Sequence, residues 1–120
     1  MSQQRWSVSR FQPAEVQALL QTYRRRYRRA GLEFVLAPRA LAQARILVVI
    51  ARRVIKSAVQ RNLLRRRLKA LFFELELVHG PVDLIVFVKT AEATQLEFKA
   101  LQQLLIQVQQ LPLPAVKASV

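Results

Sequence analysis

The chain has 120 residues, a length that suits one domain with a buried core. It has no cysteine, which excludes disulfides, thiolate nucleophiles and cysteine metal sites. Its formal net charge is +13, and no acidic residue lies between Glu33 and Glu74. Because like charges at this density repel one another, the composition indicates a polyanionic partner, with nucleic acid the first candidate and an anionic membrane surface the second.

The first predicted element is a helix that begins at Pro13, where the missing N–H of proline costs nothing. Helical spacing supports it from Ala14 to about Arg29, and Gly31 is expected to end it. The apolar residues at this spacing are Val16, Leu19, Leu20, Tyr23 and Tyr27. The last part of this helix, TYRRRYRR, interleaves arginine with tyrosine, which suits single-stranded nucleic acid. The alternative is a solvated helix end, where cations favour the helix dipole.

Two strands are predicted next. LEFVLAP, residues 32–38, ends at a proline, and RILVVIA, residues 45–51, is a β-branched run typical of a strand buried on both faces. A long helix is then expected over residues 57–77. The chain-breaking pair Gly80–Pro81 follows, and then another buried strand, DLIVFVK, over residues 83–89.

The C-terminal part is predicted to form one more helix and a tail. Thr94 and Glu97 have the spacing of a capping box, which would open a helix that runs to about Gln110. Residues 111–120 are expected to be a flexible tail. The pattern predicts a single α+β domain over residues 1–120, with helices covering a sheet. A cytoplasmic protein is expected, because the chain shows neither a secretory signal nor the ~20 apolar residues of a membrane span.

The predicted helix over residues 57–77 has an apolar side and a basic side. At about 100° per residue, the apolar side collects Leu64, Leu68, Leu71, Phe72 and Leu75. The basic side and the approach to it carry Arg52, Arg53, Lys56, Arg61, Asn62, Arg65, Arg66 and Lys69. Guanidinium groups and a helix N-terminus both suit phosphate, and Asn62 suits a base edge or a 2′-hydroxyl. The segment therefore predicts an RNA-binding surface.

Other interpretations of this segment are a solvated helix face and a membrane-surface helix. A solvated face usually mixes charge signs, because like charges one turn apart cost stability. A membrane-surface helix needs a free apolar face, which the flanking strands are expected to cover. A protein nuclease with its own metal ions is disfavoured, because Glu74 and Glu76 would point apart on a helix and the single histidine, His79, is expected in an exposed loop.

The stretch IARRVIKSAVQRNLLRRRLKALF, residues 50–72, resembles the signature of the bacterial ribonuclease P protein subunit. That family has a strand that ends in V-(S/A)-K-K, a short loop, and a helix that carries R-N-R-x-K-R. Here Arg52–Arg53 matches the end of the strand. Arg61–Asn62 matches the R-N pair, and Arg65–Arg66 matches the K-R pair.

The resemblance extends from about Val16 to Leu105, with Arg45 on the basic residue that opens the strand and Asp83 on the aspartate of the strand after the helix. It implies a two-layer α/β sandwich of element order α-β-β-β-α-β-α, whose four-stranded sheet contains a left-handed βαβ crossover. It also implies an endoribonuclease in which an RNA subunit and its Mg²⁺ ions cut precursor tRNA and release the mature 5′ end. The protein would supply no catalytic residue and no metal site. It would act as a monomer bound to one RNA subunit, without contact with a membrane.

The resemblance implies two groups of site residues. The catalytic RNA would be bound by Arg45, Arg52, Arg53, Lys56, Arg61, Asn62, Arg65, Arg66 and Lys69. The 5′ leader of precursor tRNA would lie in a cleft between the sheet and the first helix, where the family carries aromatic residues. Two registers place those positions on Val16 and Leu20, or on Leu19 and Tyr23; the second is favoured because it aligns LEFVLAP with the family's first long strand. The candidate leader contacts are then Tyr23, Tyr27 and Phe34, with a packing role as the alternative for each.

The sequence departs from the family pattern at several positions. Leu63 replaces the middle arginine of R-N-R, and Leu47 replaces a usual strand glycine. The phosphate contact at position 63 is expected to be lost, with Arg67 as an offset. Phe73 stands where an arginine is common and is expected on the polar side, to stack on a base or cover a neighbouring segment. The remaining alternative is a different basic RNA-binding protein, such as a ribosomal protein or an assembly factor, without a ribozyme partner.

Overall fold

The structure is a computed structural model that describes residues 13–22 and 26–110. Its elements are α1 (Pro13–Thr22), β1 (Arg26–Arg29), β2 (Leu32–Pro38), β3 (Ile46–Ile50), α2 (Ala58–Glu74), the 3₁₀ helix η2 (Leu77–His79), β4 (Val82–Val88), the 3₁₀ helix η3 (Ala91–Gln95) and α3 (Phe98–Gln109). Without the two 3₁₀ helices, this is the order α-β-β-β-α-β-α that the resemblance implies.

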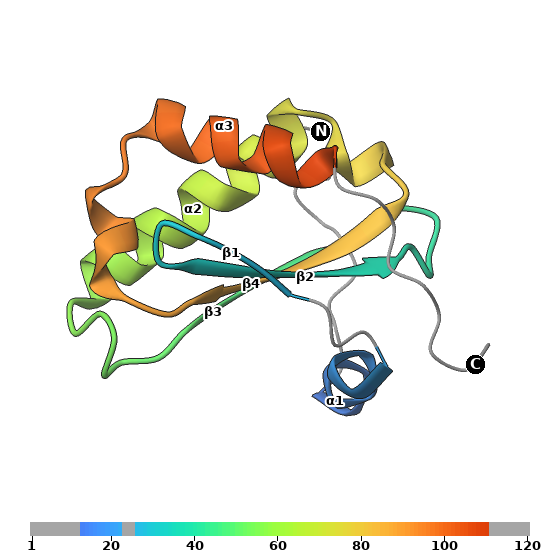
Figure 1. Cartoon of the computed structure of the whole chain (residues 1–120), viewed down its shortest axis with the longest axis horizontal. Helices are drawn as coiled ribbons and strands as arrows, with labels where there is room; N and C mark the ends of the chain where they lie inside the picture. The colour runs from blue at the N-terminus through green and yellow to red at the C-terminus, as the bar shows by residue number, and fades with distance from the viewer. Residues whose placement is uncertain (1–12, 23–25, 111–120) are drawn as a thin grey trace.

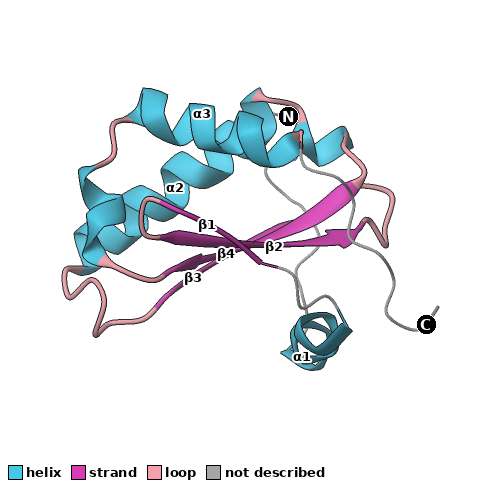
Figure 2. Ribbon diagram, viewed as in Figure 1, coloured by secondary structure: helices cyan, strands magenta, loops and turns pink. Residues whose placement is uncertain are grey.

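The four strands form one sheet in the order β1-β2-β4-β3. β2 pairs antiparallel with both β1 and β4, whereas β3 and β4 are parallel and α2 connects them. α2 and α3 lie together on one side of the sheet, and α1 lies on the opposite side (Figures 1 and 2). We refer to these two sides of the sheet as the helical face and the α1 face.

The hydrophobic core lies between the helical face and the helices α2 and α3. Alternate residues of β2, namely Leu32, Phe34 and Leu36, belong to the core cluster, as the two-residue period of a strand requires. The helices contribute Leu64, Leu68, Leu71, Phe72, Leu101, Leu105 and Val108. The predicted apolar side of α2 is therefore confirmed. The intervening β2 residues, among them Glu33 and Val35, face the α1 side of the sheet.

The first helix is shorter than the sequence predicts. α1 ends at Thr22, and Arg26–Arg29 forms β1 instead of continuing the helix. Ala30 and Gly31 form the turn into β2, with φ values of 53° and 82°, as in two-residue hairpin turns that match the twist of the strands. Glycine suits the second turn position, because a Cβ there would come within 2.4 Å of Thr90 Oγ1. The pairing of β1 with β2 therefore decides the conformation of this segment, although Tyr27 has helical spacing from the apolar residues of α1.

The start of α2 agrees with the prediction, whereas the start of α3 differs from it. α2 begins after Ser57, whose hydroxyl accepts a hydrogen bond from Gln60 N at 3.2 Å. The predicted capping box of the last helix is wrong. Thr94 lies in η3, where its hydroxyl donates to Ala91 O, and α3 begins only at Phe98. The predicted tail over residues 111–120 lies outside the described residues.

Candidate nucleic-acid interface

The junction between β3 and α2 carries a dense group of exposed cations. Arg52 and Arg53 lie in the turn after β3 and are exposed, as is Lys56 at the end of the connection. The turn is closed by hydrogen bonds from Val54 N and Ile55 N to Ala51 O. These cations therefore lie beside the N-terminus of α2, whose free N–H groups add to the positive potential.

The exposed side of α2 continues this positive potential along the helix. Val59, Asn62, Arg65, Arg66 and Lys69 line a shallow hollow, and Val59 is 76% exposed. Asn62 Oδ1 accepts a hydrogen bond of 3.4 Å from Arg65 Nη1. Within residues 13–22 and 26–110, no ion pair involves the cations of this helix. Together we call these residues the basic surface: Arg52, Arg53, Lys56, Val59, Asn62, Arg65, Arg66 and Lys69.

Arg61 has a different place from its neighbours on α2. Its Nη1 donates to Ile55 O at 2.8 Å and to Lys56 O at 3.0 Å, and its side chain is half-buried. One side of its guanidinium therefore fastens the connection that carries Lys56. This contact gives Arg61 a structural role in shaping the basic surface.

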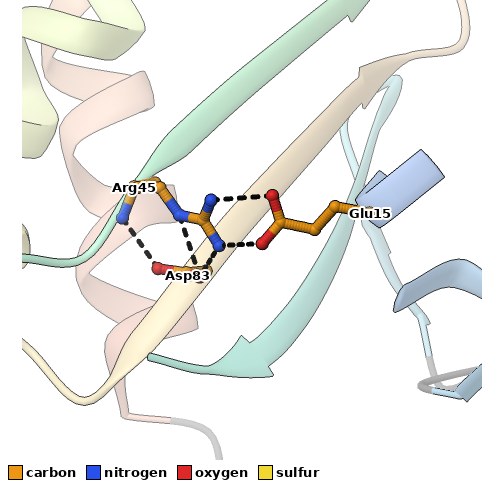
Figure 3. Close-up of polar contacts among 3 residues, drawn as sticks. All are labelled: Glu15, Arg45 and Asp83. Atoms are coloured by element: carbon orange, nitrogen blue, oxygen red, sulfur yellow. Dashed lines mark hydrogen bonds and ion pairs between the residues drawn. The ribbon is translucent and has the colours of Figure 1, made fainter. Parts of the chain in front are cut away.

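Arg45, which the resemblance places among the RNA-binding residues, does not lie on the basic surface but is buried. Its side chain is 3% exposed and lies between the carboxylates of Glu15 and Asp83 (Figure 3). Hydrogen bonding to Glu15 raises the pKa of the Arg45 guanidinium above its ordinary value; burial opposes this effect and the bonds to Asp83 reinforce it. A basic residue that opens a strand looks the same in sequence whether it points to solvent or to a buried aspartate.

The predicted leader residues do not assemble on the α1 face. Phe34 is fully buried in the core and points to the helical face. Tyr27 is its cross-strand partner, so it lies on the same face, where it is half-buried against the core. Tyr23 lies outside the described residues. The structure therefore gives Phe34 a core position and Tyr27 a partly buried position against the core, which favours the packing alternative, whereas α1 presents half-buried Val16, Leu19 and Leu20.

The α1 face instead carries an aromatic ring that the sequence reasoning missed. Phe87 of β4 is half-buried, and both Arg26 Cζ and Lys89 Nζ lie 5.8 Å from its ring centroid. The ring borders a pocket of about 210 Å³ lined by Val49, Ala51, Arg53, Val54, Phe87, Val88 and Lys89. Both cations lie over the ring in cation–π contacts and make this end of the α1 face electropositive, which suits the phosphates of a nucleic acid. The sequence does contain a signal for this arrangement. Phe87 and Lys89 are two residues apart in a strand, so their side chains lie on the same face of the sheet.

Three cations surround the buried carboxylate of Glu33 at this end of the sheet. The carboxylate is 1% exposed and accepts hydrogen bonds from Arg28 Nε at 2.6 Å and Arg26 Nη1 at 3.1 Å, with Lys89 Nζ at 4.0 Å. Burial favours the neutral form of the carboxyl, but the two hydrogen bonds and the charge of Lys89 outweigh it. The pKa of Glu33 is therefore lowered from its ordinary 4.5.

The lowered pKa of Glu33 predicts a loss of stability in acid. A depressed carboxyl pKa contributes stability that is complete above the unfolded value of 4.5 and is lost as pH falls through the folded value. In urea unfolding, the wild type is expected to exceed Glu33→Gln in stability at pH 7, and the difference is expected to shrink below pH ~4.5. Glu92→Gln, at an exposed acid, is the control. A difference that stays constant with pH would contradict the role of the carboxylate charge.

The positions that depart from the family pattern are half-buried. Phe73 is half-buried, packs edge-to-face on Phe72 at 6.1 Å and contacts the core cluster, so it covers neighbouring side chains instead of offering a free ring. Leu63 and Arg67 are half-buried on α2, and Leu47 is half-buried in β3. Leu63 adds no cation to α2, whose exposed cations are Arg66 and Lys69, with Arg65 half-buried beside them.

The described residues have two further properties that bear on function. They contain no group of three or more histidine, aspartate or glutamate side chains placed to hold a metal ion. Within the described segments, no helix is both long and apolar enough to cross a membrane.

Comparisons with known proteins agree with the fold. A family model described as Ribonuclease P matches residues 12–111. The RNase P protein of Thermotoga maritima has a TM-score of 0.71 at 14% identity, over 88% of this chain and 99% of that one. The RNase P protein of Staphylococcus aureus has a TM-score of 0.64 at 16% identity, over 82% and 88%. No curated protein matches the chain. Since the family model spans most of the sequence, the chain belongs to the Ribonuclease P family, a family of tRNA-processing ribonucleases.

Proposed function

We propose that this protein binds the catalytic RNA of ribonuclease P through its basic surface and the 5′ leader of precursor tRNA through the α1 face. The RNA carries out the Mg²⁺-dependent cleavage that releases the mature 5′ end of the tRNA. The observation that carries the proposal is the basic surface itself, where exposed cations lie beside the N-terminus of α2 without a carboxylate partner among the described residues. We further propose a cytoplasmic monomer with one RNA subunit.

The chemistry of the basic surface suits an RNA backbone. Arg65 and Arg66 offer planar donor groups that match pairs of phosphate oxygens, and Lys69 adds a point charge. Asn62 can donate to or accept from a base edge or a 2′-hydroxyl. Each phosphate contact releases counterions, so affinity for RNA is expected to fall steeply with salt.

The α1 face suits a short single strand. Phe87 offers a ring on which a base can stack, and Lys89 and Arg53 lie beside the same pocket for the phosphates. Because Arg53 also belongs to the basic surface, the two binding regions are adjacent. A leader that crosses the pocket would pass close to the catalytic RNA.

We propose that the Mg²⁺ ions of the reaction are held by the RNA and its substrate. The most buried acids of the protein do not fit a metal site, because Glu33 and Asp83 are each engaged by arginine. Glu15, the third acid of this kind, is bound to Arg45. The contribution of the protein is then to bind, orient and neutralise charge.

Reconstitution with the ribonuclease P RNA of the same organism tests the proposal. The wild type is expected to lower the Mg²⁺ concentration needed for precursor-tRNA cleavage. The triple variant Arg65→Ala/Arg66→Ala/Lys69→Ala is expected to lose this effect and to reduce the slope of log affinity against log salt by about 2–3, one unit or slightly less for each lost phosphate contact. Arg61 is left unchanged because its guanidinium fastens the β3–α2 connection.

The control removes positive charge from another surface. Arg39→Ala/Lys99→Ala changes two exposed cations that lie outside both the basic surface and the TYRRRYRR segment, and it is expected to behave as the wild type. A second arm compares Phe87→Ala with the wild type on substrates with and without a leader, where only the leader-bearing substrate is expected to bind more weakly. A wild type that binds unrelated RNA equally well and leaves cleavage unchanged would overturn the proposal in favour of a general RNA-binding protein.

A further inference from the structure

A buried arginine connects the first helix to the sheet. Arg45 comes directly before β3, and Asp83 lies opposite it at the start of β4. The second carboxylate at this arginine comes from Glu15, in the first turn of α1 (Figure 3). Glu15 and Asp83 lie 30 and 38 residues from Arg45 in the chain, so three distant segments meet at one guanidinium.

Both carboxylates accept hydrogen bonds from the guanidinium of Arg45. Asp83 Oδ1 accepts from Arg45 N at 2.8 Å, and Asp83 Oδ2 accepts from Nε at 3.3 Å and Nη2 at 2.9 Å. Glu15 accepts from Nη1 at 2.9 Å and from Nη2 at 2.5 Å. Asp83 thus fixes Arg45 to the sheet, and the bidentate pair with Glu15 fixes both the distance and the direction of α1.

α1 has little burial of its own. None of its ten residues, all of which the structure describes, is buried, and its apolar residues Val16, Leu19 and Leu20 are only half-buried. A helix of this length is marginal in isolation and depends on tertiary contacts. The polar contact with Arg45 therefore has a large share in deciding where α1 lies, and its partially buried setting makes it stronger than a surface pair.

We propose that Glu15 and Arg45 form an ionic latch that holds α1 at a fixed position over the sheet. Arg45 is a positioning residue: its buried guanidinium acts on the nucleic-acid site only through α1. The latch is a property of the free protein, whereas its consequence for the leader rests on the proposed function. If α1 forms one wall of the leader site, the latch sets the spacing between that wall and Phe87.

Spin-label distances in the free protein test the latch directly. The chain has no cysteine, so Ala18→Cys on α1 and Gln103→Cys on α3, both at exposed positions, give a single pair of labels. The otherwise unchanged protein is expected to show one narrow distance distribution. Glu15→Gln is expected to broaden or shift it, because the amide keeps the shape and loses the charge. Glu92→Gln, at an exposed acid of η3, is the matched control and is expected to leave it unchanged.

Holoenzyme binding separates the latch from its functional consequence. Glu15→Gln is expected to weaken binding of leader-bearing precursor tRNA roughly five- to tenfold, with mature tRNA and the RNA subunit bound as before. An unchanged distance distribution overturns the latch, whatever the RNA data show. A broadened distribution with unchanged leader preference supports the latch and overturns the leader site instead. Because Glu15 is one-third exposed, Glu15→Gln is expected to fold, and thermal unfolding of the labelled proteins verifies it.

Discussion

Arg45→Met is expected to lower the free energy of unfolding by about 3–5 kcal/mol, the usual effect of removing one partner from a buried ion pair. The variant leaves Asp83, which is 1% exposed, as a buried charge without its guanidinium. It also releases Glu15 and with it α1. Urea unfolding followed by circular dichroism measures the effect, with Arg39→Met, at an exposed arginine, expected within about 0.5 kcal/mol of the wild type.

A double variant separates the unpaired charge from lost packing. In Arg45→Met/Asp83→Asn the asparagine keeps an oxygen that can accept the hydrogen bond from the backbone N of residue 45, while the buried charge is gone. The double variant is therefore expected to be more stable than Arg45→Met alone, which is non-additive behaviour typical of residues in contact. Equal stability of the two variants would show that Asp83 carries no unpaired charge in Arg45→Met.

Phe34→Ala is expected to lower the unfolding free energy by about 3–5 kcal/mol, because it empties a fully buried position between the sheet and its helices. Phe34→Leu keeps most of the volume and is expected to cost much less. Leu41→Ala, at an exposed leucine, is the control and is expected to change the unfolding midpoint little. Chemical denaturation of the three variants measures these differences.

The same variants decide between a packing role and a leader role for Phe34. As a core residue, Phe34 has no contact with nucleic acid, so Phe34→Leu is expected to bind leader-bearing precursor tRNA as the wild type does. A Phe34→Leu protein that keeps its stability and loses leader affinity would instead restore the assignment made from the sequence. Holoenzyme binding at a temperature well below the unfolding midpoint makes this comparison.

The features that the sequence predicted well are those that local pattern decides. The apolar side of α2 follows from its helical period, and β2, β3 and β4 follow from runs of β-branched and aliphatic residues between chain-breaking signals. The basic surface could be predicted because its cations share one junction and one side of α2. The residue pattern did not place β1, although the resemblance implies a third strand before the long helix. The spacing of residues 26–29 is consistent with a helix or a strand, and their conformation is decided by pairing with β2.

The differences between the predicted and the observed positions of site residues come from contacts between distant segments. Arg45 and Phe34 have side chains that suit RNA, and only the register of β3 and β2 in the sheet shows that each is buried. The partners of Arg45 lie 30 and 38 residues away, a distance at which no local pattern indicates a contact. Phe87 was passed over for the opposite reason, since a phenylalanine inside an apolar strand is usually a core residue.

The hairpin of β1 and β2 has a consequence for the protein before RNA is bound. In the described part of the chain, β1 is the outermost strand on its side of the sheet, with backbone groups that could pair with an equivalent strand of another copy. Its four residues include Arg26, Arg28 and Arg29, so two such edges brought together would set like charges side by side. Glu33 pairs with two of these arginines, so the edge keeps a net positive charge, which is expected to oppose self-association. A polyanion that neutralised these arginines and left the edge uncovered would remove that protection and favour aggregation.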